Sequence, residues 1–124
     1  MTRLVEISAH ELESRAFKSS RPSVLYVHLE GFGTCRVQMR IMQQLATMVH
    51  GDIDLYVLYD LERNEALSQL GITHAPTLIF HKERVLCVIE GITPVETLIA
   101  VIKSHLGIDL KNRKHSSERR MIPC

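Results

Sequence analysis

Short apolar runs and apolar residues at helical spacing alternate along this chain. The short runs are rich in β-branched and aromatic residues, the pattern of β-strands, and they lie at residues 4–7, 23–29, 54–59, 77–81 and 85–90. Apolar residues three or four positions apart predict helices at residues 8–17, 35–49, 62–70 and 95–106. The run at 23–29 is almost continuously apolar, which predicts a strand at the centre of a sheet, buried on both faces.

Local signals mark several ends of these elements. Ser8-Ala9-His10-Glu11 and Thr93-Pro94-Val95-Glu96 each predict a capping box, in which a hydroxyl and a carboxylate satisfy free backbone N–H groups. Gly71 and Gly107 can adopt the left-handed conformation that ends a helix, so we expect helices to stop just before them. Lys82-Glu83-Arg84 separates two strand-like runs and predicts the turn of a hairpin.

The order of the predicted elements is β-α-β-α-β-α-β-β-α. Strands joined through helices pair in parallel, whereas the final hairpin is antiparallel. We therefore expect an α/β fold with a central mixed sheet and helices on both faces. The chain of 124 residues has the size of one domain, which we assign to residues 1–107. Residues 108–124 are basic and lack periodicity, which predicts a disordered C-terminal tail.

The composition argues against several functional classes. The formal net charge of +1 does not favour a general binder of nucleic acids or membrane surfaces. Residues 111–124 hold five Lys or Arg and one Glu, a surplus of +4, which leaves −3 on residues 1–110. No apolar run approaches the ~20 residues of a membrane span, and no secretory signal is visible, so we expect a cytoplasmic protein. Three cysteines without a close pair also suit a reducing compartment.

A glycine-bearing turn carries the candidate chemistry. Gly31, Phe32, Gly33 and Thr34 lie between the central strand and the helix at 35–49, and Cys35 falls in the first turn of that helix. Free N–H groups and the helix dipole at such a position favour a thiolate over a thiol. Cys35 is therefore the candidate catalytic residue.

Together with Gly71-Ile72-Thr73-His74-Ala75-Pro76-Thr77, this turn resembles the thioredoxin family over residues 4–107. In that family a Trp-Cys-Gly-Pro-Cys turn follows the central strand; the first cysteine attacks a disulfide, and the second resolves the mixed disulfide. Here Gly33 and the resolving Cys35 are present, but Phe32 stands in place of the attacking cysteine. The family's proton-relaying carboxylate is Tyr26 here, and a tyrosine with its ordinary pKa of about 10 is a poor base at neutral pH.

Ala75, Pro76 and Thr77 resemble the family's cis-proline loop. The resemblance implies that the backbone of Ala75 is open to pair with an extended peptide, and Gly91 matches a family glycine that allows close approach to the site. The predicted binding residues are Gly31, Phe32, Gly33, Thr34, Ala75, Pro76 and Thr77. A protein or an extended peptide is the expected partner.

Disulfide exchange needs two thiols, one that attacks and one that releases the intermediate. With Phe32 in the first position, this cycle cannot run within the turn. The predicted function is therefore protein binding or single-thiol redox sensing by a degenerate thioredoxin-like protein. The alternative is a thiol–disulfide oxidoreductase that uses Cys35 with a second thiol, from Cys124, a partner or glutathione. Cys35 can also be a small buried residue without chemistry.

Phe32 has two interpretations. It is either an exposed contact residue beside the Pro76 loop, or it folds inward and fills the space of the missing tryptophan. An exposed Phe32 would equally support a homodimer. Cys35, His28 and His74 have no spacing typical of metal ligands, so we expect no metal and no cofactor.

Overall fold

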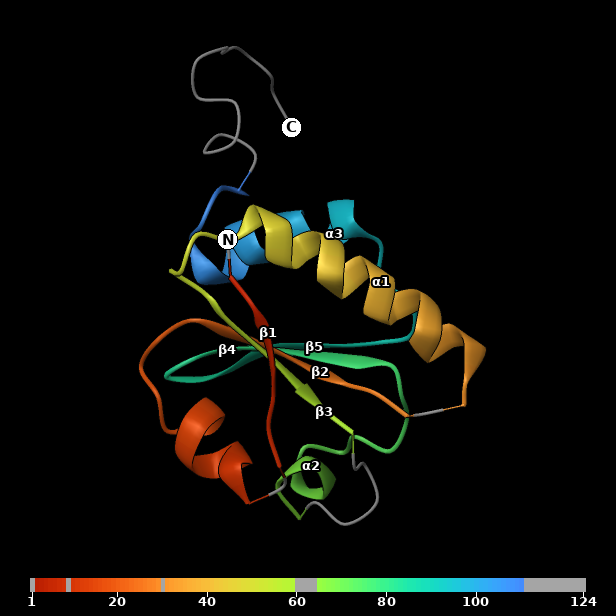
Figure 1. Ribbon diagram of the computed structural model, residues 1–124. Coiled ribbons are helices and arrows are strands. Elements are labelled where there is room, and N and C mark those ends of the chain that lie inside the picture. Colours follow the sequence, from red (N-terminus) through yellow and green to blue (C-terminus); the bar gives the residue numbers. More distant parts are fainter. Residues whose placement is uncertain (1, 9, 30, 60–64, 111–124) are drawn as a thin grey trace.

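The computed structural model describes residues 2–8, 10–29, 31–59 and 65–110 (Figure 1). Among these residues, five strands form one sheet: β1 (Leu4–Glu6), β2 (Ser23–Val27), β3 (Asp54–Leu58), β4 (Thr77–Lys82) and β5 (Arg84–Glu90). The helices are η1 (Leu12–Phe17), α1 (Gly33–Met48), α2 (Glu65–Gln69), α3 (Val95–Val101) and η2 (Ile102–Leu106). The two η segments have the wider π-type turn, and η2 continues α3 directly.

The sheet is mixed, as the element order predicts. Its strands lie in the order β1-β3-β2-β4-β5. β3 pairs in parallel with β1 and β2, whereas β4 is antiparallel to β2 and β5. Every residue of β2 is buried, which confirms that the continuous apolar run forms the central strand.

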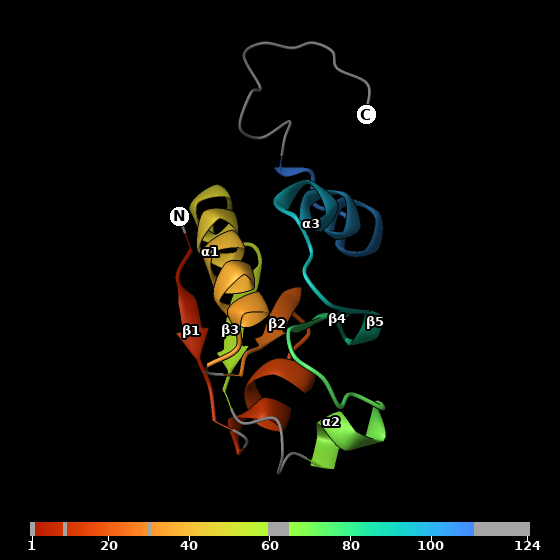
Figure 2. The same cartoon turned by 90° about the vertical axis from the view of Figure 1, so that its right-hand side faces the viewer.

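Helices cover both faces of the sheet, which also confirms the prediction (Figures 1 and 2). α1, α3 and η2 pack on one face, where Tyr26, Met42 and Phe80 belong to one apolar cluster. η1 and α2 lie on the opposite face, where Leu25 and Leu67 belong to a second cluster. Full burial of one such large apolar side chain contributes about 1.5–3 kcal/mol, so both layers help to hold β2 in place.

One of the two predicted capping boxes forms. The Ser8 N–H donates to the Glu11 carboxylate at 2.9 Å, and the Glu11 N–H donates to the Ser8 hydroxyl at 3.3 Å. These bonds lower the pKa of Glu11, chiefly through the backbone N–H of Ser8. Ser8 and Glu11 therefore cap the N-terminal side of η1.

The second predicted capping box is wrong. The Thr93 N–H does not bond to Glu96; it donates to the side-chain oxygen of Gln38 at 2.7 Å. The Gln38 amide in turn donates to the Thr93 carbonyl at 3.1 Å. A fully buried glutamine on α1 thus satisfies both backbone groups at the entry to α3 and links the two helices.

The described chain continues beyond Gly107, the residue after which we predict the domain to end. Gly107 ends η2 at φ 75°, as expected. The chain then continues along the core: Leu110 is fully buried, and Ile108 packs against the same cluster. An ion pair of 3.5 Å between Lys103 and Asp109 supports this segment. The rest of the predicted tail, residues 111–124, lies outside the described residues, as does the start of the helix predicted at 62–70.

His81 is a buried imidazole on the η1 face of the sheet. It is almost inaccessible to solvent, and its ring stacks on Phe17 with 5.4 Å between centroids. Its Nδ1 has no hydrogen-bond partner among the described residues, and the same holds for the hydroxyl of Ser23, which is its register partner on β2. Burial lowers the pKa of His81 below its ordinary value, and the Phe17 carbonyl opposes this shift in part.

We expect His81 to make the folded state less stable in acid. The unfolded chain binds this proton near pH ~6.5, whereas the folded chain resists it. The contribution of neutral His81 to the stability of the fold is therefore complete above the pKa that His81 has in the unfolded chain. It is lost as the pH falls through the lower pKa that His81 has in the folded chain. The free energy of unfolding, measured in urea, should fall less between pH 7 and pH 5 in His81→Phe than in the wild type. A loss of equal size in both proteins would contradict this, and His50→Gln serves as the exposed control.

Candidate functional site

The turn between β2 and α1 places Phe32 on the surface. Gly31 has φ +88°, a left-handed conformation that favours glycine. Phe32 is the residue just before the first turn of α1, and 52% of it is exposed. Gly33 and Thr34 are exposed as well. Phe32, which the resemblance aligns with the attacking cysteine, therefore does not fold inward and remains exposed.

Cys35 is the third residue of α1 and has no exposed surface. Its Sγ accepts a hydrogen bond from the backbone N–H of Leu29 at 3.4 Å. Its carbonyl oxygen accepts a bond of 2.7 Å from the hydroxyl of Tyr26. A thiol reacts through an accessible thiolate, so this sulfur cannot meet a disulfide until the chain around it opens.

Tyr26 and His28 form a buried network beneath the turn. The Cys35 carbonyl can only accept, so the Tyr26 hydroxyl proton points to it. The 2.6 Å contact between the Tyr26 oxygen and His28 Nδ1 must then be donated by the imidazole, which assigns a proton to Nδ1. His28 is 5% exposed and meets the ring of Tyr59 edge-on at 5.1 Å. Tyr26, which the resemblance aligns with the family's proton-relaying carboxylate, thus uses its hydroxyl to link β2 to α1.

The Pro76 loop reaches the same edge of the sheet as the turn. The first residue of β4, Thr77, pairs with the last residue of β2, so the turn after β2 and the loop before β4 lie together (Figure 1). The Ala75–Pro76 peptide bond is cis. Pro76 and Thr77 are buried, and Ala75 is half-buried. The Thr77 hydroxyl donates to the His74 carbonyl at 2.7 Å, which holds the loop closed.

Ile92 is an exposed residue at this edge that the sequence reasoning missed. The N–H of Gly91 donates to the Pro76 carbonyl at 2.8 Å, and Ile92, the next residue, is 47% exposed. Because β4 lies between β2 and β5, Phe32 follows one neighbouring strand and Ile92 follows the other. Apolar residues thus occur on both sides of the Pro76 loop. The position of Ile92 directly after Gly91 was the available signal.

His28 and His74 are not gathered around the sulfur of Cys35. His28 bonds to Tyr26, while His74 is largely exposed and lies 2.9 Å from the Thr73 hydroxyl and 3.9 Å from the Glu90 carboxylate. In the ranges that the structure describes, no group of three or more His, Cys, Asp or Glu side chains is arranged to hold a metal ion. Nor does any helix in these ranges have the length and apolar character to cross a membrane.

Solved thioredoxin structures match this architecture. The thioredoxin of Malassezia sympodialis aligns with a TM-score of 0.72 and 19% identity, over 85% of this chain and 92% of that one. Chloroplastic thioredoxin z aligns with a TM-score of 0.72 and 17% identity, over 87% of this chain and 98% of that one. The chain has the thioredoxin fold. At these identities the likeness shows the fold alone. No family model matches the sequence, and no curated protein matches it.

The burial of Cys35 can be measured by thiol labelling. In a variant with Cys87→Ser and Cys124→Ser, Cys35 is the remaining cysteine. We expect the folded protein to react at least about 100-fold more slowly than the urea-unfolded protein, because the reagent reaches the sulfur only after local opening. The matched variant that retains Cys87, which is partly exposed, should be less protected. Equal rates for folded and unfolded Cys35 would contradict its buried position.

Proposed function

We propose that this chain binds an extended segment of another protein at the edge of its sheet and does not act as a disulfide reductase. The binding edge consists of residues 31–35, residues 75–77 and Ile92. The observation that supports the proposal is the exposed side chain of Phe32 next to the fully buried Cys35. The resemblance to thioredoxins aligns Phe32 with the attacking cysteine. Disulfide exchange requires the opposite arrangement.

Phe32 is suited to be the main contact of this edge. An aromatic side chain buries a large area on binding and loses little conformational freedom, and such residues often dominate binding free energy. Ile92 offers a second apolar contact across the Pro76 loop. An extended peptide that crosses the loop would meet both side chains.

The backbone of Ala75 supports an extended partner. Among the described residues, no hydrogen bond is made to its N–H or carbonyl. Pro76 has no N–H, and its carbonyl is already bonded to Gly91. Within the described ranges, the main-chain N–H and carbonyl of Ala75 therefore have no partner, and main-chain pairing with an added strand is a common mode of peptide recognition.

Single-thiol redox sensing is the alternative role. It would need a local opening that exposes the sulfur of Cys35, since this residue is fully buried and its sulfur accepts a hydrogen bond from the Leu29 N–H. A second thiol from Cys124 would have to come from the region outside the described residues.

Three cysteines without a close pair suit a reducing compartment, so we place the proposed interaction in the cytoplasm.

The test is the affinity of the chain for extended peptides selected from a random displayed library. We expect Phe32→Ala to lower the affinity for the selected peptides by about tenfold or more, because aromatic contact residues typically contribute more than about 1 kcal/mol to the binding free energy. Val88→Ala removes an exposed apolar side chain in the middle of β5 and should leave the affinity unchanged. Circular dichroism would verify that both variants fold.

Equal affinities of the wild type and Phe32→Ala would contradict the proposal. Sedimentation analysis would test the alternative that Phe32 forms a homodimer interface. That alternative predicts a dimer in the absence of peptide, and Phe32→Ala would dissociate this dimer. A monomer whose peptide affinity depends on Phe32 is the result expected here.

A further inference from the structure

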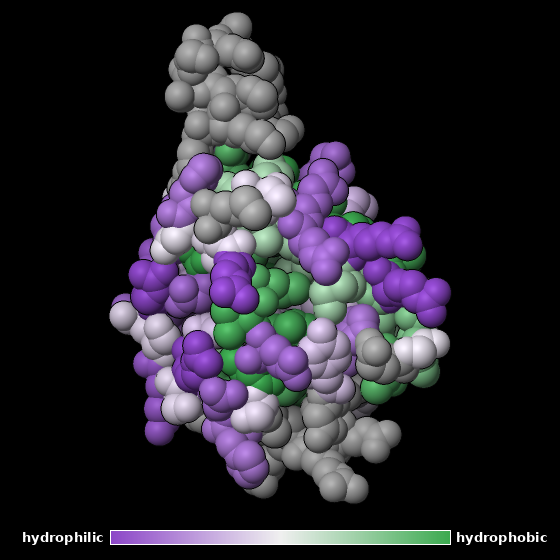
Figure 3. All heavy atoms as spheres, in the orientation of Figure 1, coloured by the Kyte–Doolittle hydropathy of each residue, from purple (hydrophilic) through white to green (hydrophobic). Residues whose placement is uncertain are grey.

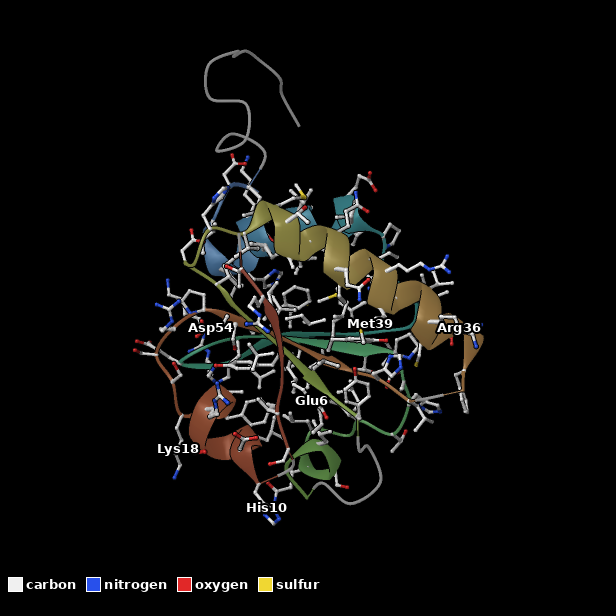
Figure 4. All side chains as sticks on the ribbon, in the orientation of Figure 1. Glu6, His10, Lys18, Arg36, Met39 and Asp54 are labelled. Atoms are coloured by element: carbon white, nitrogen blue, oxygen red, sulfur yellow. The ribbon has the colours of Figure 1, made fainter. Side chains whose placement is uncertain are left out.

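A concave surface lies on the other side of the Gly31–Cys35 turn, away from the Pro76 loop. It is a hollow of about 330 Å³ bounded by the turn, by α1 and by Tyr59, which follows β3. β3 and β4 flank β2 on opposite sides, so the hollow and the Pro76 loop are separated by the turn. Arg36 and Met39 contribute from α1, with Arg36 near the N-terminal end of the helix and Met39 between helix and sheet (Figure 4).

Two arginines line the hollow. Arg36 and Arg40 are one helical turn apart, both are exposed, and neither forms an ion pair with a described carboxylate. No acidic residue occurs among its described lining residues or in the first turn of α1, whose N-terminal end is itself positive. Hydrophilic side chains gather over this end of α1 (Figure 3). The charge stands out because residues 1–110 sum to −3.

Apolar side chains line the hollow next to these charges. Phe32 is exposed, Met39 and Tyr59 are half-buried, and the amide of Gln43 adds a polar contact. Methionine adapts its shape to an irregular neighbour. The hollow has room for an apolar side chain together with an acidic group. A small anion alone would not fill this space.

We propose that this arginine hollow (Arg36, Arg40, Phe32, Met39, Gln43 and Tyr59) binds an acidic segment of a protein partner, in which Asp or Glu flanks an apolar residue. The carboxylates pair with the arginine forks, whose planar donors match carboxylate geometry. The apolar residue packs on Phe32 and Met39. The inference rests on the proposed function, because Phe32 belongs to both surfaces and the bound segment would pass from the binding edge into the hollow.

A nucleic acid is a weaker match for this surface. Binding of a phosphate backbone depends on many phosphate contacts spread along a strand. Here two arginines stand on a domain whose residues 1–110 are net negative. An acidic peptide needs only the local pair of charges and uses the apolar wall as well.

The test uses fluorescent ten-residue peptides with a Glu-Leu-Glu core, and the same peptides with Gln-Leu-Gln. We expect the Glu peptide to bind at least about tenfold more tightly, and to weaken as salt rises from about 50 to 300 mM. Arg36→Gln with Arg40→Gln should remove the preference for Glu. The matched control is Lys82→Gln with Arg84→Gln, which removes two exposed charges from the hairpin turn and should change nothing.

Equal affinity for the Glu and Gln peptides, or a preference that survives loss of both arginines, would overturn the inference. So would a single-stranded oligonucleotide that binds more tightly than the Glu peptide and depends on the same arginines. A different result would refute the proposed function, namely that Phe32→Ala does not change the affinity for peptides selected from the library. If they depend on Phe32 but show no preference for Glu, the arginine hollow alone is refuted.

Discussion

The hydroxyl of Tyr26 joins the central strand to the first turn of α1, and the candidate site depends on this bond. At 2.7 Å from the Cys35 carbonyl, the hydroxyl fixes the helix start above β2. His28 supports it from the other side at 2.6 Å. With its backbone held in this way, Cys35 directs its sulfur to the Leu29 N–H and away from solvent. Phe32 lies earlier in the same turn, and its large side chain remains exposed to solvent.

The two surfaces around this turn differ in chemistry. On the Pro76 side, exposed apolar residues and the unbonded backbone of Ala75 suit an extended chain of any charge. On the Tyr59 side lie two arginines without acidic partners among the described residues, for which we propose a preference for carboxylates. Phe32 lies between them and contributes to both. A partner that used both surfaces would gain affinity from the apolar contacts and specificity from charge complementarity.

Periodicity predicted the strands, the mixed sheet and the position of β2, because these follow from local patterns of burial. It did not predict the contact of Gln38 with Thr93, since a glutamine within an apolar helix face looks like an interruption until α3 is placed beside it. The burial of Leu110 was missed for a similar reason: a single apolar residue beyond a helix-ending glycine has no periodicity. The sequence shows that Arg36 and Arg40 are four residues apart, but not that a hollow lies beside them, because its lining also includes Tyr59, which follows β3.

The most direct test of this account is the reduction of a protein disulfide by the wild type and by Cys35→Ala, with a dithiol thioredoxin as positive control. Exchange catalysed within the turn requires an accessible thiolate and a second thiol. We expect that neither the wild type nor Cys35→Ala exceeds the uncatalysed rate. Turnover by the wild type that Cys35→Ala abolishes would contradict it and would identify Cys35 as a reactive thiol.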